Sequence, residues 1–380
     1  MSTPRLEIDL ACIAHNVRKL VELYGAKGIS ITGVTKGVCG DPRIARVFHK
    51  NGIGVLGDAR LANMRRMRQA GIEVPFLLVR LPAMSEAQDV ITHAAMSLNT
   101  EMAVMRKLSE AAQMNNTVHR VILMVELGDL REGIMPEDLV PVARQVLDLK
   151  GLHLAGIGTS LFCYGGVQPD DEKMRQLSDH ANQIERELGI ALEVVSGGSS
   201  VNYLWFKSAK DVGRINNLRL GESLLLGGLS LEMRGIPDLS YKAFRLVAEV
   251  IESKVKPSLP WGTIGLDGFG NKPEPEDRGL IRRAIVNVGR QDVFLTTLFP
   301  EIDIDVLGAS SDHLILDAKT SNIGVSDEVG LYLDYNPMML AMTSPYVEKV
   351  YLHEEEAYGA FSGPAPPKLE EDPITDRAQP

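Results

Sequence analysis

The sequence predicts an α/β protein: a (β/α)8 TIM barrel followed by a C-terminal all-β domain. Two observations carry this prediction. From residue 29 to about residue 225, short apolar runs alternate with longer amphipathic runs, and eight such repeats favour a closed parallel barrel over a doubly wound open sheet. After about residue 242, strand-like runs follow one another across turns, without helical patterns between them.

The predicted barrel strands are short and rich in β-branched and other apolar residues, as strands buried on both faces are. Amphipathic helices are predicted between them, for example at 59–71 and 170–189. Gly189 ends the second of these, and a glycine suits a helix C-terminus because it adopts a left-handed conformation easily. The eight apolar runs lie near 29–35, 53–57, 75–81, 95–98, 119–127, 152–158, 192–196 and 215–220.

Three units are predicted along the chain. Residues 1–240 form the barrel domain, and residues 241–353 form the β domain. Residues 354–380 are acidic and proline-rich, which predicts a disordered or loosely attached tail. The strand-like runs of the β domain read FRLVAEVIESKVKP, RRAIVNVG, DIDVLGASSDHLILDA and EVGLYLDY.

The composition excludes several classes of protein. The formal net charge of −10 argues against nucleic acid or an anionic membrane surface as a partner. Three scattered cysteines (Cys12, Cys39 and Cys163) are too few for a disulfide framework or a zinc site, which fits a reducing cytosol. No run has the apolar length of a signal peptide or of a membrane-spanning helix. We therefore expect a cytoplasmic protein without a metal site.

Functional side chains of such a barrel gather at the C-terminal ends of its strands. The first strand ends at Lys36, in GVTKGVCG. This lysine either extends its ammonium group to solvent or is held in a pocket because its amine reacts. The fifth strand leads to Arg131 in ELGDLREG, and the sixth to Cys163 and Tyr164 in GTSLFCYGG.

The last two strands end in loops that suit a phosphate group. SGGSS (196–200) opens a helix, where glycines permit close approach, serines donate hydroxyls and the helix N-terminus offers free N–H groups. Such loops are often ordinary turns, but LRLGE (218–222) follows the neighbouring strand, and barrel phosphate sites commonly use these two strands. A phosphate site opposite a strand-end lysine suggests pyridoxal 5′-phosphate (PLP) as cofactor.

The chain resembles the alanine racemase-like PLP enzymes (fold type III), in particular their ornithine racemase branch, from residue 5 to about residue 352. The matching segments are GVTKGVCG, VELGDLREG, SGGSS, LRLGE and LGASSDHLILD. The resemblance implies a homodimer in which the last segment approaches the partner's site. It implies Lys36 as the Schiff-base lysine, Arg131 at the cofactor's phenolic oxygen, Arg219 at its ring nitrogen, Ser199, Ser200 and Gly221 at its phosphate, and Ser311 and Asp312 near substrate.

Arg219 also indicates the type of reaction. Decarboxylases of this fold place a carboxylate beside the ring nitrogen, which keeps that nitrogen protonated. A guanidinium group cannot accept the proton, because its pKa lies above about 12. The ring then withdraws electrons less strongly, and removal and return of the Cα proton is the favoured reaction. The sequence therefore predicts a PLP-dependent amino-acid racemase, an isomerase.

Racemisation needs an acid–base group on each face of Cα, and Lys36 can serve one of them. The tyrosine that serves the other face in alanine racemase has no counterpart in WGTIGLDGFGNKP (261–273). Asp267 is the first candidate and Cys163 the second, with Tyr164 behind them. Asp267 could instead be a turn residue, and Cys163 an ordinary buried thiol.

The substrate prediction is ornithine or another basic amino acid. The branch resemblance supports it, together with carboxylates near the predicted barrel mouth: Glu126, Asp129, Glu222 and Asp267. Two alternatives remain. One is a non-catalytic PLP-binding homeostasis protein, a family that lacks a C-terminal β domain. The other is a fold type III aldolase or dehydratase of hydroxy amino acids, which commonly carries metal-binding His and Cys near the C-terminus; His313 and His353 show no such pairing.

Overall fold

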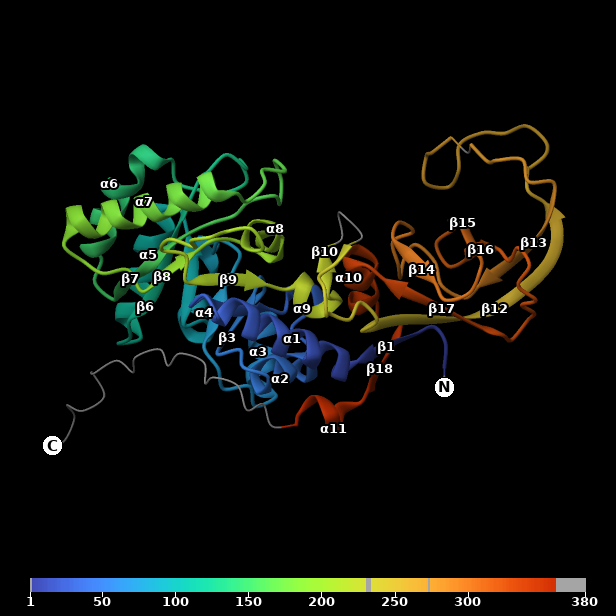
Figure 1. The fold of residues 1–380 in the computed structure, drawn as a ribbon, viewed down its shortest axis with the longest axis horizontal. Helices are drawn as coiled ribbons and strands as arrows, with labels where there is room; N and C mark the ends of the chain where they lie inside the picture. Colours follow the sequence, from blue (N-terminus) through green and yellow to red (C-terminus); the bar gives the residue numbers. More distant parts are fainter. Residues whose placement is uncertain (1, 230–233, 273, 360–380) are drawn as a thin grey trace.

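A computed structural model describes residues 2–229, 234–272 and 274–359. It consists of a helix-covered barrel and a β domain that lies beside it (Figure 1). The predicted fold class is confirmed, because eight parallel strands close into a barrel and a largely antiparallel sheet follows.

The barrel strands follow one another around the barrel in chain order, from β2 to β9, and β9 pairs with β2 to close it. All eight pairings are parallel. Each predicted apolar run overlaps one strand, and β3, β5 and β7 end one residue beyond their runs. The strands are β2 (Ser30–Val34), β3 (Val55–Asp58), β4 (Phe76–Leu78), β5 (Met96–Asn99), β6 (His119–Val125), β7 (Leu152–Thr159), β8 (Val194–Ser196) and β9 (Asn217–Leu220).

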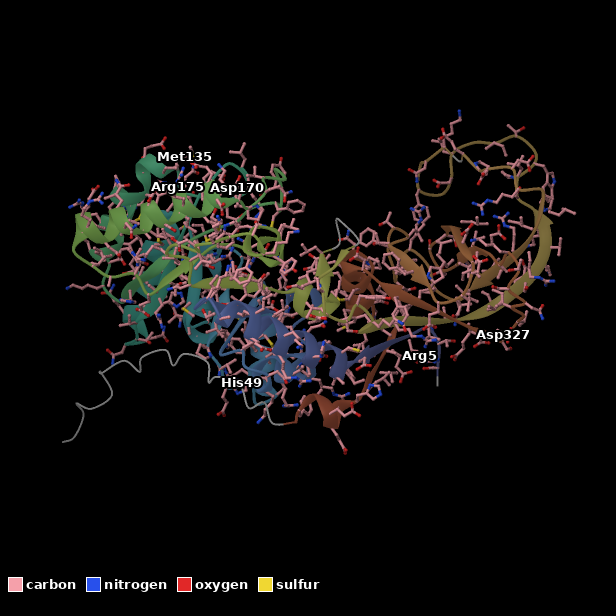
Figure 2. All side chains as sticks on the ribbon, viewed as in Figure 1. Arg5, His49, Met135, Asp170, Arg175 and Asp327 are labelled. Carbon is pink, nitrogen blue, oxygen red and sulfur yellow. The ribbon has the colours of Figure 1, made fainter. Side chains whose placement is uncertain are left out.

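Helices cover the outside of the barrel (Figure 1). The helix predicted at 170–189 is α7 (Asp171–Leu188), which begins after the cap Asp170 and ends at Gly189 with a φ of +66°. Figure 2 shows Asp170 and Arg175 on its outward side. The others are α1 (Leu10–Gly25), α2 (Pro42–Lys50), α3 (Leu61–Gln69), α4 (Ala87–His93), α5 (Met102–Met114), α6 (Leu139–Leu147), α8 (Tyr203–Phe206) and α9 (Glu222–Leu226), with short 3-10 helices η1 (Lys36–Val38), η2 (Met84–Glu86), η3 (Pro136–Asp138) and η4 (Ser200–Asn202).

The inside of the barrel has an apolar half and a polar half. Since side chains alternate along a strand, every second residue of β4 to β7 points inward, and these residues form an apolar cluster of their own that includes Leu98 and Met124. In the other half, Ser196 donates to Asn217 Oδ1 at 2.8 Å, and Asn217 donates to Thr32 Oγ1 at 3.1 Å. The polar half therefore lies beneath the strands that carry the predicted cofactor residues.

The β domain is one sheet whose path runs β14-β17-β12-β13-β16-β15. The long strand β12 (Phe244–Pro257) occupies the centre and matches the first predicted run from end to end. β1 (Arg5–Asp9) pairs with β12 and with β18, so the beginning of the predicted barrel domain belongs to this sheet instead. The remaining strands are β13 (Leu280–Val286), β14 (Leu298–Pro300), β15 (Asp305–Ala309), β16 (Leu314–Asp317), β17 (Glu328–Leu333) and β18 (Glu348–Leu352), and β10 (Gly228–Leu229) and β11 (Arg234–Gly235) form a separate hairpin.

Two helices in this part of the chain were not predicted. α10 (Tyr335–Thr343) packs on η1, the turn that begins with Lys36. α11 (Glu354–Ala357) stands where the tail was predicted to begin, and its Ala357 is fully buried. α11 is ordered because the apolar side chain of Ala357 packs in the hydrophobic core. The acidic, proline-rich composition of the segment gave no indication of this contact. The rest of the predicted tail, 360–380, lies outside the described residues.

The described chain passes between the two bodies three times: from β1 into α1, from α9 to β12, and from β18 to α11. The crossings are joined to one another. Asn16 of α1 donates to Ser240 O at 2.8 Å and accepts from Ser240 N at 2.7 Å. Asp9, which caps α1, pairs with His353 at 3.1 Å. The pairing raises the pKa of His353 above its ordinary value.

Candidate active site

Lys36 stands at the mouth of the barrel, where β2 ends. The backbone of Thr35 donates to Gly57 O on β3 at 2.8 Å, and its hydroxyl donates to the buried Asp58 at 2.7 Å. Both bonds fix the residue before Lys36. Lys36 as a whole residue is exposed in the single chain, whereas neighbouring atoms desolvate its amine. Burial by the surrounding atoms, and then Arg131 and Arg219, lower the pKa of Lys36 below that of a free lysine.

The loop after β8 forms a small cradle of backbone N–H groups and hydroxyls. Gly198 has a φ of +140°, and a Cβ there would come within 2.3 Å of Asn202 Oδ1, so only glycine fits. Asn202 closes the loop by accepting from Ser199 N at 2.9 Å and donating to Gly197 O at 2.9 Å. The cradle is thus held from within by a buried amide.

A second loop, after β9, completes this cradle. Ser200 Oγ accepts from the backbone N–H of Ser223 at 3.1 Å, which ties the N-terminus of α9 to the first loop. Gly221 lies between the two, where a Cβ would come 3.1 Å from Val34 O on β2. The predicted Ser199, Ser200 and Gly221 therefore lie together beside the strand that leads to Lys36.

Arg219 is buried at the end of β9 and points into the barrel mouth. Its Nη1 donates to Ser196 Oγ at 2.6 Å, and its Nη2 donates to Thr159 O at 2.8 Å and to Ser160 Oγ at 3.3 Å. Among the described residues, no carboxylate lies within ion-pair distance, and these bonds use three of its five N–H groups. Burial lowers the pKa of Arg219 to about 10, so it stays a cation at neutral pH.

Arg131, on the loop after β6, reaches the same place. Glu132 binds its Nε and Nη2, and Ser160 Oγ accepts from Nη2 at 3.0 Å. The ion pair raises the pKa of Arg131 above its ordinary value. Arg131 and Arg219 thus share one hydroxyl oxygen, although they come from strands far apart in the sequence.

Cys163 lies on the loop after β7 and is exposed, so its interpretation as a buried thiol is wrong. Asp129 holds this loop against the preceding one by accepting from Tyr164 N at 3.0 Å and from Val167 N at 3.3 Å. Because the loop crosses the mouth of the barrel instead of packing beneath it, its thiol faces solvent. A negative charge on Cys163 would raise the pKa of Lys36.

The remaining predicted residues belong to the β domain: Ser311 and Asp312 lie in the turn between β15 and β16, and Asp267 lies in the segment between β12 and β13. Gln291 donates to Asp312 Oδ1 at 2.7 Å and its backbone donates to Ser311 O at 3.1 Å. Arg290 stacks on Phe269 at 4.2 Å, which brings the loop of Asp267 to the same surface. The predicted residues therefore form two groups in one chain, one at the barrel mouth and one on the β domain.

Asp267 caps a turn on an exposed loop. Its Oδ1 accepts from Phe269 N at 2.9 Å and from Asn271 N at 2.8 Å. These bonds lower the pKa of Asp267, whereas a carboxylate that accepts a Cα proton needs a raised pKa. Within one chain Asp267 is thus a turn residue, and its role as a base stays a prediction that requires burial by a partner.

Comparison with known proteins identifies the family. The profile described as "Alanine racemase, N-terminal domain" matches residues 8–227, more than half of the chain. The chain belongs to the alanine racemase family. A lysine racemase from Thermotoga maritima is 41% identical over 353 residues, covering 92% of this chain and 99% of that protein. An ornithine racemase from Acetoanaerobium sticklandii is 36% identical over 354 residues, covering 92% and 99%.

A solved alanine racemase from Clostridium difficile 630, in complex with cycloserine, superimposes with a TM-score of 0.71. The match covers 92% of this chain and 96% of that one at 20% identity, and it supports the fold alone. Since both curated relatives are racemases that align over nearly the whole chain, this member of the alanine racemase family is a racemase and therefore an isomerase.

Four residues that hold the site of this racemase together were not predicted from its sequence. Ser160, Ser196 and Ser223 each contact a predicted residue, and Glu132 binds Arg131. Three of the four lie at the C-terminal end of a barrel strand or in the turn that follows it, so the strand-end rule pointed to their segments. Their short polar side chains carry no signal of their own.

Two carboxylates expected at the substrate-binding lip have a structural task instead. Glu126 accepts from Gly128 N at 2.6 Å and from Leu130 N at 3.1 Å. Asp129 holds the loop after β7, as described above, and is 1% exposed. Loops at the barrel mouth leave backbone N–H groups that no strand pairs, and these two side chains satisfy them. They are not free to bind a substrate ammonium group.

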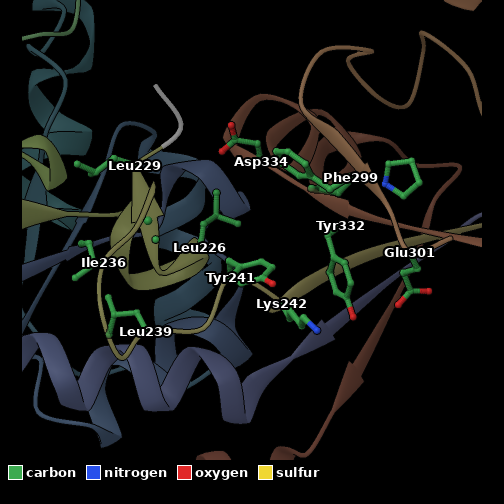
Figure 3. A pocket seen from close by; sticks show the side chains of 14 residues that line it. Leu226, Leu229, Ile236, Leu239, Tyr241, Lys242, Phe299, Glu301, Tyr332 and Asp334 are labelled. Carbon is green, nitrogen blue, oxygen red and sulfur yellow. The ribbon is translucent and has the colours of Figure 1, made fainter. Parts of the chain in front are cut away.

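A large groove lies apart from this site, at the junction of the two domains (Figure 3). Its volume is about 820 Å³. Leu226 and Ile236 line it from the barrel side, and Phe299, Tyr332 and Glu301 line it from the β domain. None of its 14 lining residues belongs to the predicted site, so the groove separates the domains and does not extend the barrel mouth.

Proposed function

We propose that this racemase binds PLP at the barrel mouth and interconverts the L- and D-enantiomers of ornithine or another basic amino acid, such as lysine. One observation carries the cofactor assignment: a lysine with a lowered pKa, a two-loop cradle and two arginines lie together at the C-terminal ends of the barrel strands. The names of the two aligned relatives support the choice of a basic substrate.

The residues present fit PLP. The cradle of Ser199, Ser200 and Gly221 offers hydroxyl and backbone donors for a phosphate. Arg219 keeps two N–H groups for a ring nitrogen, and Arg131 brings a cation for a phenolic oxygen. When bound, the cofactor supplies a carbonyl that condenses with amines and a ring that withdraws electrons from Cα.

The chain's own residues then move the proton. Lys36 Nζ accepts the Cα proton on one face and returns one there in the reverse direction. Its lowered pKa favours the neutral amine that this task needs. For the opposite face we propose Asp267 of a partner subunit, with Cys163 as the alternative, since its thiol is exposed at the same mouth. Ser311 and Asp312 of the partner would then lie near the substrate.

The direct test is to incubate the purified protein with PLP and each L-amino acid and to measure D-product by chiral chromatography. Ornithine and lysine are expected to give the highest kcat/KM. Alanine should react slowly. Equal rates for all amino acids would contradict the substrate proposal. Bound PLP without racemisation of any amino acid would support the homeostasis alternative instead.

A homodimer with composite sites is the second part of the proposal, because Asp267 and Asp312 belong to the β domain whereas Lys36 belongs to the barrel mouth. We propose a cytoplasmic homodimer. In the described part of the chain, no helix is long and apolar enough to cross a membrane. Over the same residues, no group of three or more His, Cys, Asp or Glu is arranged to hold a metal ion.

Mixing two inactive variants tests the composite site. Lys36→Ala and Asp267→Asn are each expected to lose activity alone. After the subunits are exchanged, half of the dimers are mixed, and each mixed dimer has one intact site. Activity should then return to roughly a quarter of that of the unmodified protein. Sedimentation confirms that dimers are present, and a mixture that stays inactive contradicts composite sites.

A further inference from the structure

Ser160 joins the two arginines of the site. Its hydroxyl oxygen accepts from Arg131 Nη2 at 3.0 Å and from Arg219 Nη2 at 3.3 Å, and it donates to Glu132 Oε1 at 3.1 Å. A serine hydroxyl has one donor and two acceptor positions, so all three are used. Its orientation is therefore fixed by its neighbours.

Glu132 completes the arrangement. It pairs with Arg131 through both oxygens while Oε1 also receives the Ser160 proton. The side chain of Glu132 is 14% exposed, so solvent screens the pair only partly. Bidentate carboxylate–guanidinium pairs of this kind fix geometry as well as charge.

We propose that Glu132 and Ser160 form a clamp that positions Arg131 and Arg219 as one unit along one edge of the bound cofactor's ring. The inference rests on the proposed function, since it assigns this edge to PLP. The ring nitrogen and the phenolic oxygen lie on the same edge of that ring, and the shared Ser160 hydroxyl brings the two guanidinium groups to one place.

The clamp also solves an electrostatic problem. Two guanidinium groups close together repel each other, and Arg219 is buried, with no carboxylate paired to it among the described residues. Glu132 is the carboxylate that binds the pair, directly at Arg131 and through Ser160 at Arg219. Its charge opposes the lowering of the pKa of Arg219 that burial causes. Both arginines are positioned through these two residues, which do not themselves need to contact the cofactor.

The test uses Glu132→Gln, Ser160→Ala and the double variant, with Glu137→Gln on the exposed η3 as matched control. PLP is titrated into apoprotein, and the affinity is read from quenching of tryptophan fluorescence. The pH dependence of the bound cofactor's absorbance reports the charge along its ring edge. Hydrogen exchange of segments 126–134 and 158–164 in the apoprotein reports whether the loops loosen together.

Glu132→Gln is expected to weaken PLP binding by about 10-fold, to shift the absorbance profile and to speed exchange in both segments. Ser160→Ala should act in the same direction, and the double variant should be little worse than Glu132→Gln, because the two residues act as one unit. Ser160→Thr, which keeps the hydroxyl, should restore most of the affinity. The control should match the unmodified protein.

Unchanged affinity and absorbance in both single variants would overturn the clamp while leaving the proposed function intact. Effects that simply multiply in the double variant would also overturn it, because independent contacts behave that way. A lower melting temperature without a spectral shift would assign Glu132 and Ser160 a purely structural role. If the unmodified protein binds no PLP, the proposed function and the clamp both fall.

Discussion

Lys36→Ala is expected to lose racemisation, together with the visible absorbance of bound PLP that borohydride reduction removes. The variant lacks both the amine that binds the cofactor covalently and the base for one face of Cα. A positioned acid–base group alone contributes about 10²–10⁴-fold, so the loss should be at least that large. Lys50→Ala, on the exposed end of α2, is the matched control and should racemise normally.

The pH dependence sharpens this prediction. Because burial lowers the pKa of Lys36, its amine loses the proton at a lower pH than an ordinary lysine, whose pKa is about 10.4. The limb of the kcat profile that reports Lys36, whose amine is free once substrate is bound, should therefore lie below that value. Racemisation by Lys36→Ala at the normal rate would remove the lysine from the mechanism, whatever the limb shows.

Arg219→Glu is expected to change the reaction as well as slow it. A carboxylate at this position would keep the ring nitrogen protonated, so the electron pair left at Cα would persist for longer. Part of the substrate would then leave as a keto acid instead of as the other enantiomer. Racemisation should fall on the order of 10²-fold, and keto acid should accumulate.

Arg219→Lys serves as the comparison for this variant. It keeps a cation beside the ring but loses the planar donors that bind Ser196, Thr159 and Ser160, so it should lose rate without forming keto acid. Chiral chromatography and keto-acid detection separate the two outcomes. If Arg219→Glu forms no more keto acid than the unmodified protein, Arg219 does not determine the reaction type.

The barrel could be predicted from sequence because its signals are local. Strand β2 and its neighbours are continuous apolar runs. Gly189 ends α7 in the left-handed conformation, which glycine adopts easily whatever surrounds the helix. β1 could not be placed in this way. Its partners are β12 and β18, which lie more than 230 residues further along the chain, and nothing in its own residues names them.

The site residues also differ in whether local sequence or long-range contacts determine their roles. Lys36 and Arg219 are recognisable because each stands at a strand end in a segment typical of the family. The role of Ser160 depends on two guanidinium groups that come from other strands, so its own sequence segment does not indicate that role. Asp267 shows the opposite limit: its segment suggested a base, and the turn that it caps became visible only in the structure.

The three crossings between the two bodies have a mechanical consequence. A single linker would let the β domain rotate freely, whereas three connections that are bonded to one another, through Asn16 with Ser240 and Asp9 with His353, restrict that rotation. The β domain therefore keeps one orientation relative to the barrel. Asp267 and Asp312 would then reach a neighbouring molecule without a closing movement. Because the chain passes between the bodies three times, a single truncation could not separate one body from the other. Removing β1 should thus loosen both halves at once.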